Sequence, residues 1–341
     1  MEHVQRKQDH LDIALTRDVS SGLDTGLGAI RLRHCALPDL ALAAVSTATE
    51  FMGRRLATPL LISAMTGGTA EGGRINRNLA QAAQSRRVAL ALGSGRVALV
   101  EPTTLETLAV RELAPDVPLF ANLGAVQLNY GLTTDDCRRL VDLLQADGLI
   151  LHLNPLQEAL QTGGDTDFRG LLPKIAAVCA ALPVPVIVKE VGWGLSGPTA
   201  AALASAGVAA LDVAGAGGTS WSEVERHRAA DALAARVARP FRDWGLSTVE
   251  SLLETVAACP HLPIIASGGI CTGVDALKCL ALGARAVGMA GGLLQAAATS
   301  AAAVEDAIDV FTAQLTTAMF AAGVGDVAAI DASIILRGPR G

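Results

Sequence analysis

Eight short apolar runs recur along the chain, and most of them end in glycine or polar residues. Runs of this kind are typical of strands that are buried on both faces, as in a parallel sheet. They cover residues 59–65, 88–95, 118–124, 148–154, 185–191, 210–217, 263–269 and 286–292.

Alanine-rich segments separate these runs, and their apolar residues recur at helical spacing. The clearest segments cover residues 73–87, 133–146, 199–207, 248–258 and 273–282. Thr133, Ser247 and Thr272 occupy positions where the N-cap residue of a helix is expected. Eight strand–helix units within roughly 250 residues are typical of a (β/α)₈ TIM barrel, an α/β fold that we predict here. A doubly wound open sheet is the alternative, but it rarely holds eight units at such even spacing.

Two segments depart from a plain barrel. We predict that residues 1–57 form an N-terminal segment closing over the barrel mouth, that residues 58–322 form the barrel, and that residues 323–341 form a C-terminal tail. A charged insertion, Thr219–Gly245, follows the sixth predicted strand and carries Trp221 and Trp244. Loops after barrel strands carry function, so the insertion is either a lid or cofactor wall, or an extra surface helix.

Composition narrows the class of protein. Hydrophobic residues make up 51% of the chain and the net charge is -6, which gives no electrostatic footprint for nucleic acid. The six cysteines form no CxxC pair, so we expect small buried thiols in a reducing compartment. No apolar run approaches a membrane span, and the N-terminus lacks a signal-peptide core. These features predict a cytoplasmic protein without membrane or nucleic-acid partners.

Glycine and polar residues gather at the predicted strand ends, which converge on one face of a barrel. SGGI at 267–270 and GMAGG at 288–292 follow the last two strands. The loops after these two strands form the usual phosphate site of such barrels. Glycines let the backbone approach a ligand closely and present N–H donors to a phosphate.

The fourth strand ends in the most polar segment, LHLNPLQEALQTGGD at 151–165. His152 and Asn154 alternate on one face of the strand, and Gln157 and Glu158 are expected on the loop just past it. One carboxylate together with phosphate oxygens and waters is how Mg²⁺ is usually held. The set therefore predicts a phosphorylated ligand with Mg²⁺ on Glu158, although a solvated glutamate at a helix start is the alternative.

Three cations are candidates for an anionic ligand. Lys189 ends the apolar strand VIVK, where a lysine needs a partner. A structural pair with Glu190 is awkward because successive strand residues face opposite sides. Arg6 and Lys7 belong to RKQDH at 6–10, a segment that can fold over the barrel mouth and clamp a phosphate.

At this point the chain resembles the type 2, FMN-dependent isopentenyl-diphosphate isomerase family over nearly its whole length. The motifs that carry the resemblance are RKQDH at 6–10, AMTGGT at 64–69, ALGSGR at 91–96, ANLG at 121–124, LNPLQEA at 153–159, VKEVGWGLS at 188–196, DVAGAGGTSW at 212–221, FRDWG at 241–245, SGGI at 267–270 and GMAGG at 288–292.

The resemblance implies a site in which FMN, substrate and Mg²⁺ lie together. Residues implied to bind FMN are Ala64, Met65, Thr66, Ser94, Asn122, Lys189, Thr219, Gly268, Gly269, Ile270, Met289 and Ala290. Residues implied to hold the substrate diphosphate are Arg6, Lys7, Ser94, Arg96, His152, Asn154 and Gln157, with His152 and Gln157 also expected to act in catalysis. Glu158 would bind Mg²⁺.

The reaction implied is movement of a double bond, from isopentenyl to dimethylallyl diphosphate. An alkene is a very weak base, so its proton donor must be held close and sheltered from water. The family assigns the acid and base to reduced FMN, and NADPH serves only to reduce the flavin. Family members assemble as tetramers or octamers, so a homo-oligomer is implied.

Four positions depart from the commoner family pattern: Gly95, Thr162, Gly163 and Trp193. They leave open a homologue that acts on a modified allylic diphosphate. A second alternative is an FMN-dependent 2-hydroxy-acid oxidase or dehydrogenase, but AGAGGTS lacks the histidine and arginine of the HGGRQ-like pattern. A third is a flavin-storing protein, which would not need Arg6, Lys7, Gln157 or Glu158.

Overall fold

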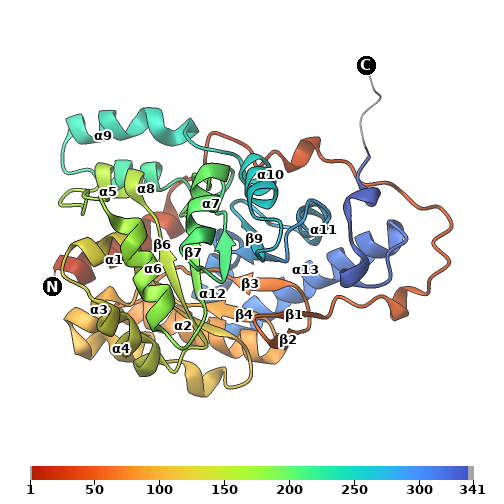
Figure 1. Ribbon diagram of the computed structural model, residues 1–341, viewed down its shortest axis with the longest axis horizontal. Helices are drawn as coiled ribbons and strands as arrows, with labels where there is room; N and C mark the ends of the chain where they lie inside the picture. Colours follow the sequence, from red (N-terminus) through yellow and green to blue (C-terminus); the bar gives the residue numbers. More distant parts are fainter. Residues whose placement is uncertain (1, 337–341) are drawn as a thin grey trace.

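Eight parallel strands close into a barrel in the computed structural model, which describes residues 2–336 and side chains from residue 4 onward (Figure 1). Neighbouring strands follow the chain order, and the last strand pairs with the first. The strands are β3 (Leu60–Ile62), β4 (Ala89–Ala91), β5 (Leu119–Gly124), β6 (Gly148–His152), β7 (Val186–Lys189), β8 (Ala210–Asp212), β9 (Ile264–Ser267) and β10 (Ala286–Met289). Each predicted apolar run contains one of them, so the predicted (β/α)₈ barrel is confirmed.

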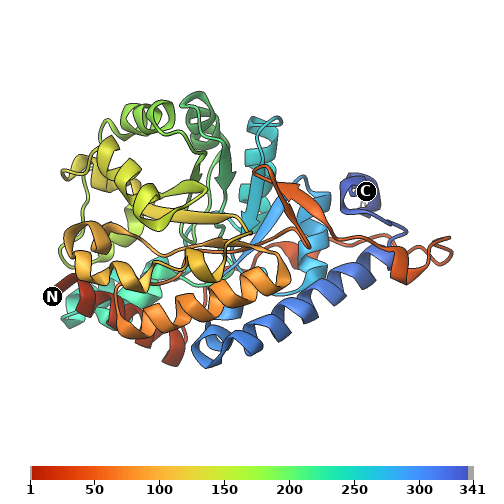
Figure 2. The same cartoon turned by 90° about the horizontal axis from the view of Figure 1, so that it is seen from below.

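Helices connect the strands and cover the outside of the barrel (Figure 1). They are α1 (Glu2–Thr16), α2 (Ala70–Arg86), α3 (Arg96–Val100), α4 (Thr134–Leu144), α5 (Pro155–Leu160), α6 (Leu171–Ala181), α7 (Gly197–Ser205), α8 (Trp221–Arg228), α9 (Ala232–Ala238), α10 (Thr248–Ala258), α11 (Gly273–Ala281), α12 (Gly291–Thr299) and α13 (Ala301–Ala321). The long helices α2 and α13 pack side by side, as Figure 2 shows. Within residues 2–336, no helix has both the length and the apolar character needed to cross a membrane.

Short 3₁₀ turns complete the connections. They are η1 (Leu27–Ala29), η2 (Leu42–Ala44), η3 (Pro102–Thr107), η4 (Arg111–Leu113), η5 (Ala125–Asn129), η6 (Arg239–Asp243), η7 (Val327–Ala329) and η8 (Ala332–Ile334). After β4, α3 and the turns η3 and η4 take the place of one long barrel helix.

The three predicted N-cap residues start helices α4, α10 and α11. The side chains of Thr133, Ser247 and Thr272 each accept a hydrogen bond from the backbone N–H three residues later. In each case the acidic side chain at that later position accepts a bond from the N–H of the cap residue. These capping boxes satisfy backbone donors that the first helical turn leaves unpaired.

One layer of apolar side chains fills the half of the barrel nearer the amino ends of its strands. Its members come from alternate positions of the strands: Leu61, Ala91, Phe120, Ile150, Ile187, Ala210, Ile265 and Ala286. The hairpin of β1 (Thr49–Phe51) and β2 (Arg54–Leu56) adds Phe51 and Leu56 to this cluster. The Phe51 ring packs edge-on against that of Phe120, with 6.2 Å between ring centroids. The hairpin therefore covers the amino end of the barrel, opposite the carboxyl ends of the strands.

Segments from both ends of the chain lie against the barrel. Helix α1 packs against α8 and α2, and Ser20 pairs with Thr219 just after β8. Farther along, Leu32 pairs with Ile335 and Ser46 with Asp326, so the stretch after α1 runs beside the end of the described chain (Figure 1). Of the predicted tail, residues 323–336 make these contacts, and residues 337–341 lie outside the described part.

Candidate active site

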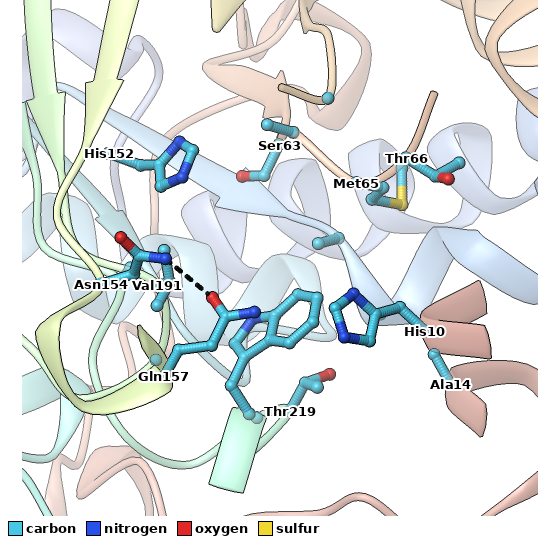
Figure 3. A pocket seen from close by; sticks show the side chains of 18 of the residues that line it. His10, Ala14, Ser63, Met65, Thr66, His152, Asn154, Gln157, Val191 and Thr219 are labelled. Atoms are coloured by element: carbon cyan, nitrogen blue, oxygen red, sulfur yellow. Dashed lines mark hydrogen bonds between the residues drawn. The ribbon is translucent and has the colours of Figure 1, made fainter. Parts of the chain in front are cut away.

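A cavity of about 520 Å³ opens at the carboxyl ends of the barrel strands. Residues that follow each of the eight strands line it, together with α1 and the segment after it (Figure 3). This is the face on which (β/α)₈ enzymes carry their active sites.

The floor of the cavity is a polar layer within the barrel. Since side chains alternate along a strand, the positions two residues beyond the apolar layer also face inward. These positions are Ser63, Gly93, Asn122, His152, Lys189, Asp212, Ser267 and Gly288. All of them except Asp212 line the cavity. The barrel interior therefore changes from apolar to polar between two successive layers of inward-facing side chains.

Nearly all of the predicted site residues come together around this cavity. Those that line it are Arg6, Lys7, Ala64, Met65, Thr66, Ser94, Arg96, Asn122, His152, Asn154, Gln157, Glu158, Lys189, Thr219, Gly268, Gly269, Ile270 and Ala290. Met289 does not line it. Because Met289 alternates with the inward position Gly288, its side chain lies in the core between the barrel and the helices.

His152 is an uncharged imidazole at the end of β6. Burial lowers its pKa to about 3, and the nearby charges of Lys189 and Lys7 add to the effect. Its Nδ1 lies 2.8 Å from Asn122 Oδ1. Since an amide oxygen only accepts hydrogen bonds, the ring hydrogen lies on Nδ1, and Nε2 is left as an acceptor. At neutral pH His152 is therefore a polar contact and not a cation.

Gln157 and Glu158 lie on the short helix α5 and not on the predicted loop. Pro155 occupies a first-turn position of this helix, where its fixed φ and missing N–H are tolerated. The Glu158 carboxylate is 7% exposed, so it is not a solvated glutamate at a helix start. Its Oε1 accepts from Asn154 Nδ2 at 3.0 Å. Asn154 Nδ2 also lies 3.2 Å from Gln157 Oε1 (Figure 3).

Several cavity atoms lack a protein partner. Among the described residues, Asn154 Oδ1 and Ser63 Oγ are buried and make no hydrogen bond. Both residues line the cavity. A buried polar atom without a partner costs free energy, and a polar ligand placed against these two would offset that cost.

Lys189 and Glu190 face different surroundings, as strand alternation predicts. The Lys189 ammonium faces the cavity floor and donates to the backbone oxygen of Glu190. The Glu190 carboxylate accepts from the backbone N–H groups of Val191, Gly192 and Trp193. Burial raises the pKa of Glu190 to about 7, against the opposing effect of these hydrogen bonds. The structural pair between the two side chains is absent from the described ion pairs, and the lysine remains available to a ligand.

Asp212 is a site-adjacent acid that the sequence interpretation missed. It is 0% exposed and accepts from Ser267 Oγ at 2.5 Å. Burial raises the pKa of this carboxyl, while Lys189 opposes the rise. In the barrel register Asp212 is the neighbour of Lys189. An acid inside the apolar run ALDVAGAG, level with a buried lysine, is the signal that could have identified it.

The basic pair on α1 reaches the cavity. Lys7 Nζ donates to the backbone oxygen of Ser94 at 3.2 Å. Burial lowers the pKa of Lys7 to about 8, and the charge of Arg6 lowers it further. The Arg6 pKa is also lowered, chiefly by burial, while the carboxylate of Glu158 opposes the change. Both cations are therefore partly desolvated at the cavity, a setting that favours an anionic ligand.

The insertion after β8 combines the two predicted alternatives. Its first helix, α8, is a wall of the cavity, because Trp221 lines it and packs edge-on against His10 at 5.2 Å between centroids. Its second helix, α9, lies outside α8 at the edge of the molecule (Figure 1). Trp244 is 59% exposed and does not line the cavity.

Glu225 is a second residue that the sequence interpretation missed. It lies one helical turn after Trp221, and its Oε1 is 2.9 Å from His10 Nε2. Gln157 Nε2 donates to the same oxygen at 3.4 Å. The spacing of four residues from Trp221 puts both side chains on one face of α8, so helical periodicity could have found it.

Glycines make a cradle at the ends of β8 and β9. A Cβ on Gly218 would lie 2.5 Å from the backbone nitrogen of Gly269, and one on Gly269 would lie 2.3 Å from the backbone oxygen of Gly217. Only glycine fits such close backbone approaches. Helix α12 begins beside this cradle, and Ala290, Gly291 and Gly292 at its start line the cavity. Backbone N–H groups at a helix start attract a phosphate, so the cradle and the start of α12 are a candidate phosphate site.

None of the four departures from the family pattern lines the cavity. Thr162 and Gly163 are exposed, and Trp193 is buried beneath Gly245. At Gly95 a Cβ would lie 2.5 Å from Leu140 Cδ1, so a larger residue there would need Leu140 to move. The four departures from the family pattern therefore lie around the site, and the residues that line the cavity keep the pattern.

Comparison with known proteins identifies the family. Residues 157–337 match the family model described as FMN-dependent dehydrogenase. Isopentenyl-diphosphate delta-isomerase of a Synechococcus strain is 55% identical over 334 residues, which are 98% of this chain and 96% of that protein. The enzyme of the same name from Stutzerimonas stutzeri is 52% identical over 338 residues, covering 98% and 97% of the two chains.

Solved structures at lower identity share the fold. A mandelate oxidase variant with a monooxide FMN adduct superposes with a TM-score of 0.67 at 20% identity, covering 95% of this chain and 94% of that one. A flavocytochrome b2 variant with bound sulfite gives a TM-score of 0.71 at 18% identity, covering 97% and 85%. The sequence relatives, together with this fold, place the chain in the type 2, FMN-dependent isopentenyl-diphosphate delta-isomerase family.

Proposed function

We propose that the protein isomerises isopentenyl diphosphate to dimethylallyl diphosphate with bound FMN. One observation carries the proposal: a single cavity holds two separate sets of anion-binding groups. The glycine cradle and the start of α12 come from the ends of β8, β9 and β10. Arg6 and Lys7 come from α1, whereas Arg96 and the amide side chains at the start of α5 come from the ends of β4 and β6. One set suits a cofactor phosphate, and the other suits a substrate diphosphate.

The cavity residues fit FMN. The cradle and the start of α12 offer backbone N–H groups to a phosphate, and Lys189 offers a cation from the polar floor. Ala64, Met65 and Thr66 add a mostly apolar wall after β3. Bound FMN, once reduced by NADPH, would supply a group able to give and take the proton without net oxidation. The chain itself supplies binding, orientation and exclusion of water.

The diphosphate set fits a metal-bound ligand. Glu158 is the carboxylate on the cavity wall, and no group of three or more acidic, histidine or cysteine side chains that could hold a metal occurs in the part of the chain that the structure describes. Mg²⁺ is usually held by one or two carboxylates together with substrate phosphates and waters. We therefore assign Mg²⁺ to Glu158 and the phosphate oxygens. Binding energy from the diphosphate would hold the alkene in place for proton transfer.

His152 and Gln157 are the side chains that we place nearest the alkene. His152 is uncharged, and Gln157 joins Asn154 to Glu225 through its amide. In this proposal they orient the substrate, and α1 closes the mouth with Arg6 and Lys7. We extend the proposal to a cytoplasmic homo-oligomer, a tetramer or octamer, as the family suggests.

Oxidation of a 2-hydroxy acid is the competing function for this fold. Such enzymes need a histidine base and an arginine clamp after a late strand, whereas this chain has AGAGGTS at 214–220. The direct test supplies the FMN-loaded protein, under anaerobic conditions, with isopentenyl diphosphate, Mg²⁺ and NADPH, or with lactate or mandelate alone. We expect dimethylallyl diphosphate in the first case and no bleaching of the flavin in the second. Flavin reduction by a 2-hydroxy acid without isomerase turnover would reverse the assignment.

A further inference from the structure

The loop between α5 and α6 carries an acid that contacts the arginine of the diphosphate set. Asp165 Oδ2 accepts from Arg96 Nη1 at 2.7 Å. The same oxygen accepts from Gln127 Nε2 at 3.1 Å. The side chains of Arg96 and Asp165 are 25% and 16% exposed, so the pair lies at the edge of the cavity and is partly shielded from water.

The backbone of the same residue contacts the proposed metal ligand. The N–H of Asp165 donates to Glu158 Oε2 at 2.8 Å. Gln161 Nε2 donates to that oxygen at 3.1 Å. With both donors on Oε2 and Asn154 on Oε1, the carboxylate of Glu158 is held in one orientation. Asp165 therefore touches the arginine through its side chain and the metal ligand through its backbone.

An acid in this place is unfavourable on charge alone. A carboxylate beside an anion site repels the anion, and removing it should strengthen binding if the charge were its only effect. Arg96 has several N–H donors in a planar fork, and Asp165 occupies one end of that fork. The remaining donors are then presented to the cavity in a fixed direction, which favours a bidentate contact with a phosphate.

We propose that Asp165 is a positioning residue. It holds the side chains of Arg96 and Glu158 in fixed positions relative to each other, so that a Mg²⁺-bound diphosphate can contact both. The inference rests on the proposed function and deepens it. The charge of Asp165 should weaken diphosphate binding, whereas positioning by Asp165 should strengthen it. Whether binding weakens or strengthens when the charge is removed therefore distinguishes the two effects.

The test measures binding of inorganic pyrophosphate with Mg²⁺ to the FMN-loaded protein by calorimetry. Asp165→Asn keeps the shape and removes the charge, and we expect binding about tenfold weaker, with flavin content and spectrum unchanged. Asp167→Asn is the matched control, because Asp167 lies in the same loop and pairs with exposed Arg169. The control should bind as the parent does.

A double-mutant cycle separates positioning from a general structural effect. If Asp165 acts through Arg96, adding Asp165→Asn to an Arg96→Gln protein should weaken binding by less than about twofold further. Arg96→Lys should also weaken binding, because lysine cannot contact the carboxylate and the phosphate in the same planar fork. If Asp165→Asn does not fold, parent-like binding by Arg96→Lys would still count against the inference, because the proposal requires the planar fork of Arg96.

Four results would overturn the inference. Equal or tighter pyrophosphate binding by Asp165→Asn would show that the charge is the only effect. If Asp165→Asn weakened pyrophosphate binding as much in the Arg96→Gln protein as in the parent, Asp165 would not act through Arg96. Parent-like binding by Arg96→Lys would show the same. A parent protein that carries FMN but binds no pyrophosphate with Mg²⁺ would refute the proposed function itself, and the inference with it.

Discussion

At the scale of single residues, the site is built from buried charge and amide groups at inward-facing strand positions. Alternation along a strand was enough to predict that Lys189 faces a ligand and that Glu190 does not pair with it. The same rule puts Asp212 in the polar floor, although its strand has the appearance of a plain apolar run. The sequence could not predict which side chains Glu225 and Asp165 contact, because each reaches the site through a contact between distant segments.

Lys7 gives the site a predicted pH dependence. Its pKa is about 8 without ligand, and a bound diphosphate would raise it by adding negative charge nearby. Binding is then strongest below pH 8, where Lys7 is already protonated, and above pH 8 it must take up a proton. We expect the affinity for pyrophosphate, relative to that of Lys7→Arg, to fall by up to about tenfold per pH unit above pH 8.

Using Lys7→Arg as the reference removes the titration of pyrophosphate itself, since arginine stays charged throughout this range. Calorimetric titrations of both proteins from pH 6.5 to 9.5 would supply the ratio. A ratio that does not change with pH would mean that Lys7 keeps its charge or does not contact the ligand.

Glu158 is predicted to bind Mg²⁺, a role beyond any contribution of its side chain to the fold. Glu158→Gln keeps the size of the side chain and removes the negative charge that Mg²⁺ requires. We expect about a 10- to 100-fold higher Mg²⁺ requirement for turnover, with the flavin spectrum intact. Glu305→Gln, which changes a half-buried partner of Arg86 on α13, is the control. Unchanged activity at limiting Mg²⁺ would exclude Glu158 as a ligand.

At the scale of elements, local signals predicted the barrel helices well. Apolar spacing and the caps Thr133, Ser247 and Thr272 placed the starts of α4, α10 and α11 within a residue. Helix α5 was missed because it has one and a half turns and follows a strand directly. A segment this short shows no apolar period, and Pro155 at its start is equally typical of a loop.

The cap of α4 is predicted to stabilise the whole domain. Thr133→Ala removes the acceptor for the N–H of Asp136 and should lower the free energy of unfolding by about 1 kcal/mol. Hydrogen bonds to Thr133 lower the pKa of Asp136, so their contribution is present at neutral pH and is lost as acid protonates that carboxyl. The cost of the substitution should therefore shrink in acid.

Urea unfolding at two pH values would measure both effects. Thr299→Ala is the control, because Thr299 is exposed and its hydroxyl bonds only to the preceding turn of α12. A Thr133→Ala protein as stable as the parent at neutral pH would show that this box contributes nothing.

At the scale of the whole molecule, the barrel count and an N-terminal segment over its mouth were predictable, but the contacts that hold this segment in place were not. Eight strand–helix units determine that the strand ends converge, so residues as distant as Met65 and Ala290 share one cavity. The contacts of α1 with α8, and of residues 32–46 with the end of the chain, depend on surfaces that exist only after the barrel has formed. The periodicity of apolar residues in the sequence does not predict these contacts. The structure thus shows how α1 and α8 together form a wall of the site, a role that the sequence offered for each segment separately.

The most direct measurement is proton NMR of isopentenyl diphosphate incubated in D₂O with the FMN-loaded protein, Mg²⁺ and NADPH without oxygen. If the cavity performs the proposed isomerisation, dimethylallyl diphosphate should appear and carry deuterium from solvent, because the added proton comes from an exchangeable group. Once NADPH has reduced the flavin, it should stay reduced throughout turnover. Isopentenyl diphosphate recovered unchanged, with reduced flavin and Mg²⁺ bound, would contradict the account.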